Sequence, residues 1–273
     1  MINLNLKYKE LLNKIDGLIT IKPDISIILG SGLGDFANSI NIRNTISTSS
    51  LPGYPASTIQ GHEGKIISGE YSGKNILLFQ GRIHFYEGYK INECLLPVLI
   101  SKKMGAKKIL LTNAAGGINP NFHPGDLMLA TSFNSINIKK ELLEVTGLPT
   151  AETKNFLLDF PTEEINKIIR LSAEQENIKI VEGTYWYTKG PSYETPAEIK
   201  MIKKFGGDAV GMSTAYEGIF ASLLGLQTGS ISCITNYAAG ISNKKLNHSE
   251  VTDTANLVKD KFERLVKRVI SLI

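Results

Sequence analysis

The stretch Asn75–Tyr89, NILLFQGRIHFYEGY, indicates the fold class of this chain. Its first part, Ile76–Phe79, is a short, uninterrupted apolar run, which is typical of a strand buried on both faces of a sheet. Arg82 and His84 follow two residues apart, so in extended backbone their side chains point the same way. Open α/β sheets bind ligands at the carboxyl ends of their strands. Because Arg presents a planar donor fork and His a second donor, the pair predicts a small-anion site, although a solvated loop could carry the same two residues.

Strands and helices alternate along the whole chain, which predicts an α/β fold with a central mixed β-sheet flanked by helices. We expect one domain over residues 1–273, since no linker or repeat interrupts the alternation. The expected strands are residues 25–29, 65–71, 75–79, 108–112, 127–130, 181–188, 208–210 and 229–235. The expected helices are residues 1–17, 91–104, 167–175, 249–273 and two that begin at Thr195 and Thr214. Residues 132–163 show no clear period and are expected to be irregular.

The bulk composition argues against several classes of protein. No apolar run approaches the roughly 20 residues that a membrane-spanning helix needs. The N-terminus has an amphipathic pattern and not that of a signal peptide, and Cys94 and Cys233 lie in separate apolar stretches, so we expect core thiols and a cytoplasmic protein. The net charge is only +4, and the basic run 102–108 spans a helix end, which argues against a nucleic-acid partner. The four histidines lack metal-ligand spacing, so no metal is expected.

Small and polar residues follow several of the expected strands. Residues 30–34 read GSGLG, and a glycine turn after a strand lets backbone N–H groups approach an anion. This differs from the dinucleotide pattern GxGxxG, and residues 48–50, where a ribose-binding acid would be expected, are Thr-Ser-Ser. Residues 113–117 (NAAGG) form another exit, and Ser213 precedes an expected capping box, Thr214–Glu217, at a helix N-terminus. These exits, taken with the Arg and His pair, predict a phosphate-type site.

Seven ordered motifs of the chain resemble those of the trimeric purine nucleoside phosphorylases. They are IILGSGLG, QGHEG, QGRIHFYEGY, TNAAGGINP, GPSYETPAE, GMSTAYE and ITNYAAG, and the resemblance covers about residues 25–260. It implies reversible phosphorolysis of 6-oxopurine ribonucleosides or deoxyribonucleosides, such as inosine and guanosine, to a free base and the sugar 1-phosphate. It also implies purine salvage by a homotrimer, with inorganic phosphate as co-substrate and no cofactor.

The resemblance further implies a role for each matching residue. Phosphate would be bound by Ser31, His62, Arg82, His84, the Ala114 backbone and Ser213. The nucleoside would be contacted by Tyr86, Tyr193, Glu194, Met212, Asn236, His248 and, from a neighbouring subunit, Phe156. Within this set, the catalytic residues would be His84, Glu194 and Asn236.

The chain departs from the family pattern in a few places. Tyr193 stands where the family usually has Phe, and GMSTAYE replaces the common GMSTVPE. The larger departure is residues 132–161, where the family's asparagine- and glycine-rich segment is scarcely visible and FLLDFP is its remnant. The match of Phe156 to the aromatic residue that a neighbour lends therefore rests on this remnant alone.

Two other functions fit parts of the same pattern. A methylthioadenosine phosphorylase of the same superfamily would want an acid in place of Asn236 and an apolar residue in place of His248, so both residues argue against it. A non-catalytic nucleoside- or anion-binding protein on the same fold draws support only from the altered segment 132–161. Base release from several nucleosides, with and without phosphate, distinguishes all three.

Overall fold

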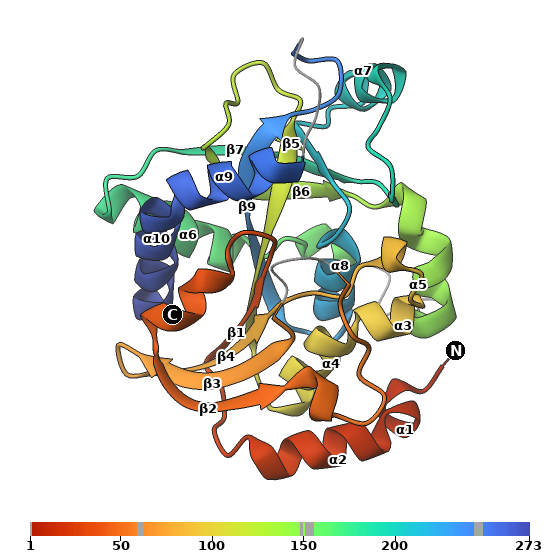
Figure 1. The fold of residues 1–273 in the computed structure, drawn as a ribbon, viewed down its shortest axis with the longest axis vertical. Helices are drawn as coiled ribbons and strands as arrows, with labels where there is room; N and C mark the ends of the chain where they lie inside the picture. The colour runs from red at the N-terminus through yellow and green to blue at the C-terminus, as the bar shows by residue number, and fades with distance from the viewer. Residues whose placement is uncertain (1, 59–62, 148–149, 151–155, 243–247) are drawn as a thin grey trace.

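The computed structural model describes residues 2–58, 63–147, 150, 156–242 and 248–273, and within them it contains a nine-stranded mixed sheet between helices (Figure 1). The strands are β1 (Ile25–Leu29), β2 (Asn41–Ser47), β3 (Lys65–Tyr71), β4 (Lys74–Gln80), β5 (Lys108–Gly117), β6 (Leu127–Asn134), β7 (Ile180–Tyr187), β8 (Ala209–Gly211) and β9 (Gln227–Tyr237). The α-helices are α1 (Leu4–Lys7), α2 (Lys9–Leu18), α3 (Ile91–Cys94), α4 (Leu96–Lys103), α5 (Lys139–Thr146), α6 (Glu163–Gln175), α7 (Pro196–Lys204), α8 (Ala215–Leu223), α9 (His248–Leu257) and α10 (Lys259–Leu272). Short 3-10 helices are η1 (Gly34–Ser39), η2 (Thr48–Ser50), η3 (Phe85–Glu87), η4 (Ile136–Ile138) and η5 (Phe156–Asp159). The predicted fold class is confirmed.

The sheet is ordered β2-β3-β4-β1-β5-β8-β7-β6-β9, and β9 also pairs with β5. Strands β5, β8, β7, β6 and β9 therefore close into a ring, while β2, β3, β4 and β1 extend from it as an open sheet. The strand β4 runs parallel to β1, with Phe79 in register with Ile28, and its residues 76–79 are all buried, as their apolar run predicted. The hairpin between β3 and β4 turns at Ser72 and Gly73, whose φ angles of 52° and 76° suit a tight two-residue turn.

Two apolar layers hold the helices on opposite faces of the sheet (Figure 1). One layer packs α1 to α5 and α8 against the sheet, and the other packs η1, α6, α9 and α10. In the second layer the rings of Phe36 and Phe262 meet edge to face, with their centroids 6.2 Å apart. Cys94 and Cys233 are buried free thiols, as expected, and burial raises the pKa of Cys233 to about 12. Within the described residues no helix has the length and apolar character to cross a bilayer.

Several expected elements differ from those observed. Each of the three long helices is divided, at Tyr8, at Leu95 and at Val258. The second division has a clear cause, because Pro97 lies in the first turn of α4, where its missing N–H is tolerated, and the same ring would clash inside a longer helix. The described residues between 132 and 147 are more regular than predicted: β6 continues to Asn134, and α5 buries Leu142 and Val145.

The segment 113–117 is also not a loop exit, as was expected from its small residues. It is the last half of β5, paired with β9 along its length and with β8 at Gly116 and Gly117. Small side chains suit this segment because neighbouring strands approach it closely on both sides. A Cβ on Gly117, for example, would lie 3.0 Å from the Cγ2 of Ile234 on β9.

Candidate active site

A cavity of about 420 Å³ opens where β1, β5, β8 and β9 end. The predicted site residues that line it are Ser31, Arg82, His84, Tyr86, Ala114, Tyr193, Glu194, Met212, Ser213 and Asn236. His62 lies outside the described residues, and Phe156 and His248 begin η5 and α9 with side chains that are likewise not described. The strand ends thus bring segments that are up to 205 residues apart in the sequence, from Ser31 to Asn236, around one space.

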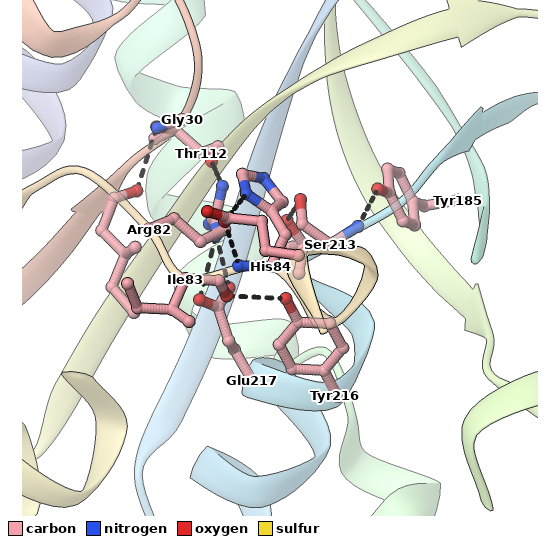
Figure 2. Close-up of polar contacts among 12 residues, drawn as sticks. Gly30, Arg82, Ile83, His84, Thr112, Tyr185, Ser213, Tyr216 and Glu217 are labelled. Carbon is pink, nitrogen blue, oxygen red and sulfur yellow. Dashed lines mark hydrogen bonds and ion pairs between the residues drawn. The ribbon is translucent and has the colours of Figure 1, made fainter. Parts of the chain in front are cut away.

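Arg82 lines this cavity and is a buried cation, and its polar contacts are drawn in Figure 2. Its Nε donates to both carboxylate oxygens of Glu217, at 2.9 and 3.0 Å, and its Nη1 donates to the Thr112 carbonyl at 3.0 Å. Burial disfavours the charged guanidinium, but the adjacent Glu217 carboxylate outweighs burial, so the pKa of Arg82 is raised. The cation is therefore permanent, and two of its nitrogens fix its plane.

The predicted capping box at Thr214–Glu217 is wrong. Thr214 makes no side-chain cap hydrogen bond at the start of α8, and Glu217 turns inward to Arg82. The side chains of Arg82 and Glu217 are 1% and 0% exposed. Leaving a buried charge without a partner costs far more free energy than leaving a helix start without a cap. A single acid in the otherwise apolar stretch AYEGIFASLL was the sequence signal that could have revealed this pair.

Ser213 lies just before α8, where the backbone is strained. Thr214 has φ of 70°, which is rare for a β-branched residue and is found mostly at functional sites. The Ser213 N–H donates to the Tyr185 hydroxyl at 3.4 Å, and the Ser213 and Thr214 hydroxyl oxygens lie 3.1 Å apart. The fully buried Tyr185 ring thus supports the turn that presents Ser213 to the cavity.

His84 is oriented by Glu87, a residue that the sequence reasoning missed. The Glu87 Oε1 accepts from the His84 backbone N–H at 2.8 Å and lies 3.1 Å from the ring Nδ1, while its Oε2 accepts from the backbone and the hydroxyl of Thr58. Although burial acts to raise the pKa of Glu87, these hydrogen bonds lower it to about 2. Burial in turn lowers the pKa of His84.

These two shifts decide what His84 offers. An ionised carboxylate only accepts, so the His84 proton sits on Nδ1 and a neutral ring presents Nε2 as an acceptor. His84 was expected to act as a second donor, whereas its contact with Glu87 and its lowered pKa favour an acceptor at Nε2 near neutral pH. The Tyr86 ring stacks on His84 with centroids 4.7 Å apart, and burial raises the pKa of Tyr86 to about 12, so its phenol stays neutral.

The other end of the cavity carries Glu194 and Asn236. Glu194 precedes α7, which starts at the predicted capping box of Thr195 and Glu198, and its Oε1 accepts from the Thr188 hydroxyl. The Asn236 Nδ2 donates to the Tyr237 carbonyl at 2.9 Å, and its Oδ1 accepts from the Thr235 hydroxyl at 2.9 Å. Because a carbonyl can only accept, this pair of contacts assigns the amide orientation and leaves one N–H and one lone pair for a ligand.

The cavity therefore has two chemically distinct ends. One combines a buried cation, an imidazole and hydroxyls, and suits a small anion. The other combines a carboxylate with a carboxamide, and suits a heterocycle that both donates and accepts hydrogen bonds. Among the described residues, no cluster of potential ligands could hold a metal ion.

Comparison with known proteins gives a consistent result. Residues 24–271 match the phosphorylase superfamily. The chain is 40% identical over 256 residues to purine nucleoside phosphorylase 1 of Geobacillus stearothermophilus, covering 91% of this chain and 90% of the relative. Schistosoma mansoni purine nucleoside phosphorylase, solved with adenosine, matches at a TM-score of 0.88 and 31% identity, covering 99% of this chain and 98% of that one. A Schistosoma mansoni purine nucleoside phosphorylase solved with inosine matches at a TM-score of 0.86 and 30% identity, covering 100% of this chain and 98% of that one. The chain therefore belongs to the phosphorylase superfamily, among its purine nucleoside phosphorylases.

Proposed function

We propose that this enzyme catalyses the reversible phosphorolysis of 6-oxopurine nucleosides, such as inosine and guanosine, and serves purine salvage in the cytoplasm. The products are a free purine and ribose 1-phosphate or its deoxy form. The observation that carries the proposal is that one cavity joins the anion end, with Arg82 and His84, to the base end, with Glu194 and Asn236.

At the anion end, inorganic phosphate is the co-substrate and needs no cofactor. We assign its oxygens to the hydroxyls of Ser31 and Ser213, the guanidinium of Arg82 and the Ala114 backbone. A neutral His84 would take the P–OH hydrogen at Nε2, and His62 would complete the set. The phosphate can thereby be held as a dianion beside the sugar, with fixed donors that require no rearrangement during reaction.

In the middle of the cavity, the glycosidic bond breaks between the sugar and the base. The sugar develops positive charge and the base develops negative charge, so the phosphate dianion stabilises the sugar and then attacks its anomeric carbon. We assign Tyr86, Tyr193 and Met212 to the walls of the ribose site and His248 to the 5′-hydroxyl. The neutral phenol of Tyr86 suits this place because it adds no charge that would oppose the phosphate.

At the base end, hydrogen-bond polarity selects the purine. A 6-oxopurine carries a proton on N1 and an acceptor at O6, whereas adenine has a bare N1 and a 6-amino group. Glu194 accepts from N1–H, and the unused N–H of Asn236 donates to O6 while its oxygen takes a proton on N7. Adenine would leave these groups unpaired, which a site can convert into strong discrimination.

The Schistosoma enzyme has been solved with both adenosine and inosine, so bound ligand alone does not reveal preference in this family. The deciding experiment is therefore kinetic: release of free base from inosine, guanosine, adenosine and methylthioadenosine, each with and without phosphate. We expect phosphate-dependent release that is fastest with inosine and guanosine. Release without phosphate, release fastest with adenosine or methylthioadenosine, or binding without release would each contradict the proposal.

We also propose a homotrimer in which a neighbour completes the base end. The support is that Tyr193 is 44% exposed in the single chain although it lines the cavity, and that Leu158, two residues after the candidate Phe156, is 81% exposed. Light scattering with wild type and Phe156→Ala tests this arrangement. We expect a species about three times 29.9 kDa and, in the variant, a higher KM for nucleoside; a fully active monomer would contradict it.

A further inference from the structure

The peptide group that joins Ile83 to His84 is held at both of its polar atoms. Its carbonyl oxygen, on Ile83, accepts from the Tyr216 hydroxyl at 3.2 Å, and its N–H, on His84, donates to Glu87 at 2.8 Å (Figure 2). A peptide group is planar, so fixing both atoms fixes the plane and the directions in which the neighbouring side chains leave it. This peptide lies between Arg82 and His84, the two residues that make the anion end suited to bind a small anion.

Tyr216 is well suited to this contact. Its side chain is fully buried, where a phenol hydroxyl needs a partner, and it does not itself line the cavity. Burial raises the pKa of Tyr216 well above its usual value of 10, so the hydroxyl remains a donor across the working pH range. The family motif quoted above has proline at this position, and proline has no group that could make this bond.

The next residue in the same helix turn makes a second contact with the same segment. Glu217 binds the Arg82 Nε, so adjacent residues of α8 hold Arg82 and the peptide after Ile83. The helix α8 also begins directly after Ser213 and Thr214. One rigid element therefore connects the serine hydroxyl, the guanidinium and the imidazole of the anion end.

We infer that Tyr216 is a positioning residue for phosphate use, which acts by holding the Ile83–His84 peptide so that Arg82 and His84 meet the phosphate together. The inference rests on the proposed phosphorolysis and adds to it a residue that touches no substrate. The first turn of α8 therefore supports phosphate binding as well as packing in the core.

Tyr216→Phe is the direct test, because it removes one hydroxyl and keeps the ring. We expect the KM for phosphate to rise about fivefold, the effect of one neutral hydrogen bond, while the KM for inosine and the melting temperature change little. Tyr187→Phe is the matched control, because it removes a hydroxyl from a neighbouring buried tyrosine. The Tyr187 ring packs edge to face on Tyr216 at 5.6 Å, and its buried hydroxyl has no hydrogen-bond partner among the described residues.

The outcomes separate cleanly. An unchanged KM for phosphate in Tyr216→Phe, in an enzyme whose wild type requires phosphate, overturns the inference and leaves the proposed function standing. Equal rises in both KM values, or the same change in Tyr187→Phe, would indicate a purely structural role and also overturn it. A wild type that releases base without phosphate would instead contradict the proposed function. If Tyr216→Phe folds poorly, the rise in melting temperature with added inorganic phosphate gives the same comparison on the folded fraction.

Discussion

The two ends of the cavity are built differently. At the anion end, Arg82 and Glu217 are almost fully buried, and their contacts join β4, β5 and α8, which are far apart in the sequence. At the base end, Glu194 and Asn236 are only partly buried, and their side-chain hydrogen bonds among the described residues reach partners at most six positions away. A buried charge is held in place here by contacts with residues far away in the sequence. The donors and acceptors that would recognise a base are instead positioned by nearby residues of a loop and a strand end. The comparison predicts that damage at the anion end spreads to folding and that damage at the base end stays local.

Arg82→Ala is the variant for which we expect the largest effect. The variant leaves the buried Glu217 carboxylate without its cation, so we expect unfolding to become easier by about 3–5 kcal/mol and phosphate use to be lost. The double variant Arg82→Met with Glu217→Met removes both charges and should recover most of the stability but none of the phosphate use. Urea unfolding and phosphate titration of both proteins measure this. Equal stability in the single and double variants would show that the ion pair does not support the fold.

Asn236→Asp tests the base end. The change removes the N–H that we assign to O6 and adds a second carboxylate to the cavity that Glu194 lines. The transition-state stabilisation measured by kcat/KM for inosine should therefore fall by about 2 kcal/mol or more, with a smaller change for adenosine. The preference for inosine over adenosine should therefore shrink, while the KM for phosphate and the free energy of unfolding stay close to wild type. An unaltered ratio of the two kcat/KM values would mean that Asn236 does not read the base.

Thr188→Val tests the base end with a smaller expected effect. It removes the hydroxyl that orients the Glu194 carboxylate but keeps the shape of the side chain. We expect the transition-state stabilisation measured by kcat/KM for inosine to fall by about 1–2 kcal/mol, with no effect on the KM for phosphate. Thr146→Val is a matched control, because that hydroxyl bonds only to carbonyls at its own helix end. A shift in phosphate KM would show that the two ends are not independent.

The smallest effect concerns acid stability. Hydrogen bonds lower the pKa of Glu87 from 4.5 to about 2, so its contribution to stability is present above pH 4.5 and is lost as the pH falls from 4.5 towards 2. Glu87→Gln should therefore be less stable than wild type at neutral pH, with the difference vanishing as pH decreases through this window. Glu10→Gln, on the exposed side of α2, serves as the control. A difference that stays constant down to pH 2 would contradict the assigned role of Glu87.

Much of the fold followed from local patterns. The strand Ile25–Leu29 was predicted with its observed bounds because an apolar run that ends at glycine marks a buried strand, and Lys65–Tyr71 because the turn at Ser72 and Gly73 marks a hairpin. The α7 capping box at Thr195 was predicted for the same kind of reason, since a cap is a contact among residues three apart. The divided helices and α5 were missed because helical period does not mark where a helix breaks: Pro97 divides one of the long helices, and α5 is held by the burial of Leu142 and Val145.

The site residues divide along the same line. Motif order and strand period were enough to predict that Arg82, His84, Ser213 and Asn236 lie at strand ends around one site, because neither depends on what lies across the molecule. The partners of those residues depend on the whole fold. Glu217 had the local pattern of a helix cap and became the partner of Arg82, and Tyr216 came to hold the peptide after Ile83, because a buried charge or hydroxyl takes whichever partner the fold brings within reach. Partners such as these lie more than 130 positions apart, and no local pattern in the chain encodes that distance.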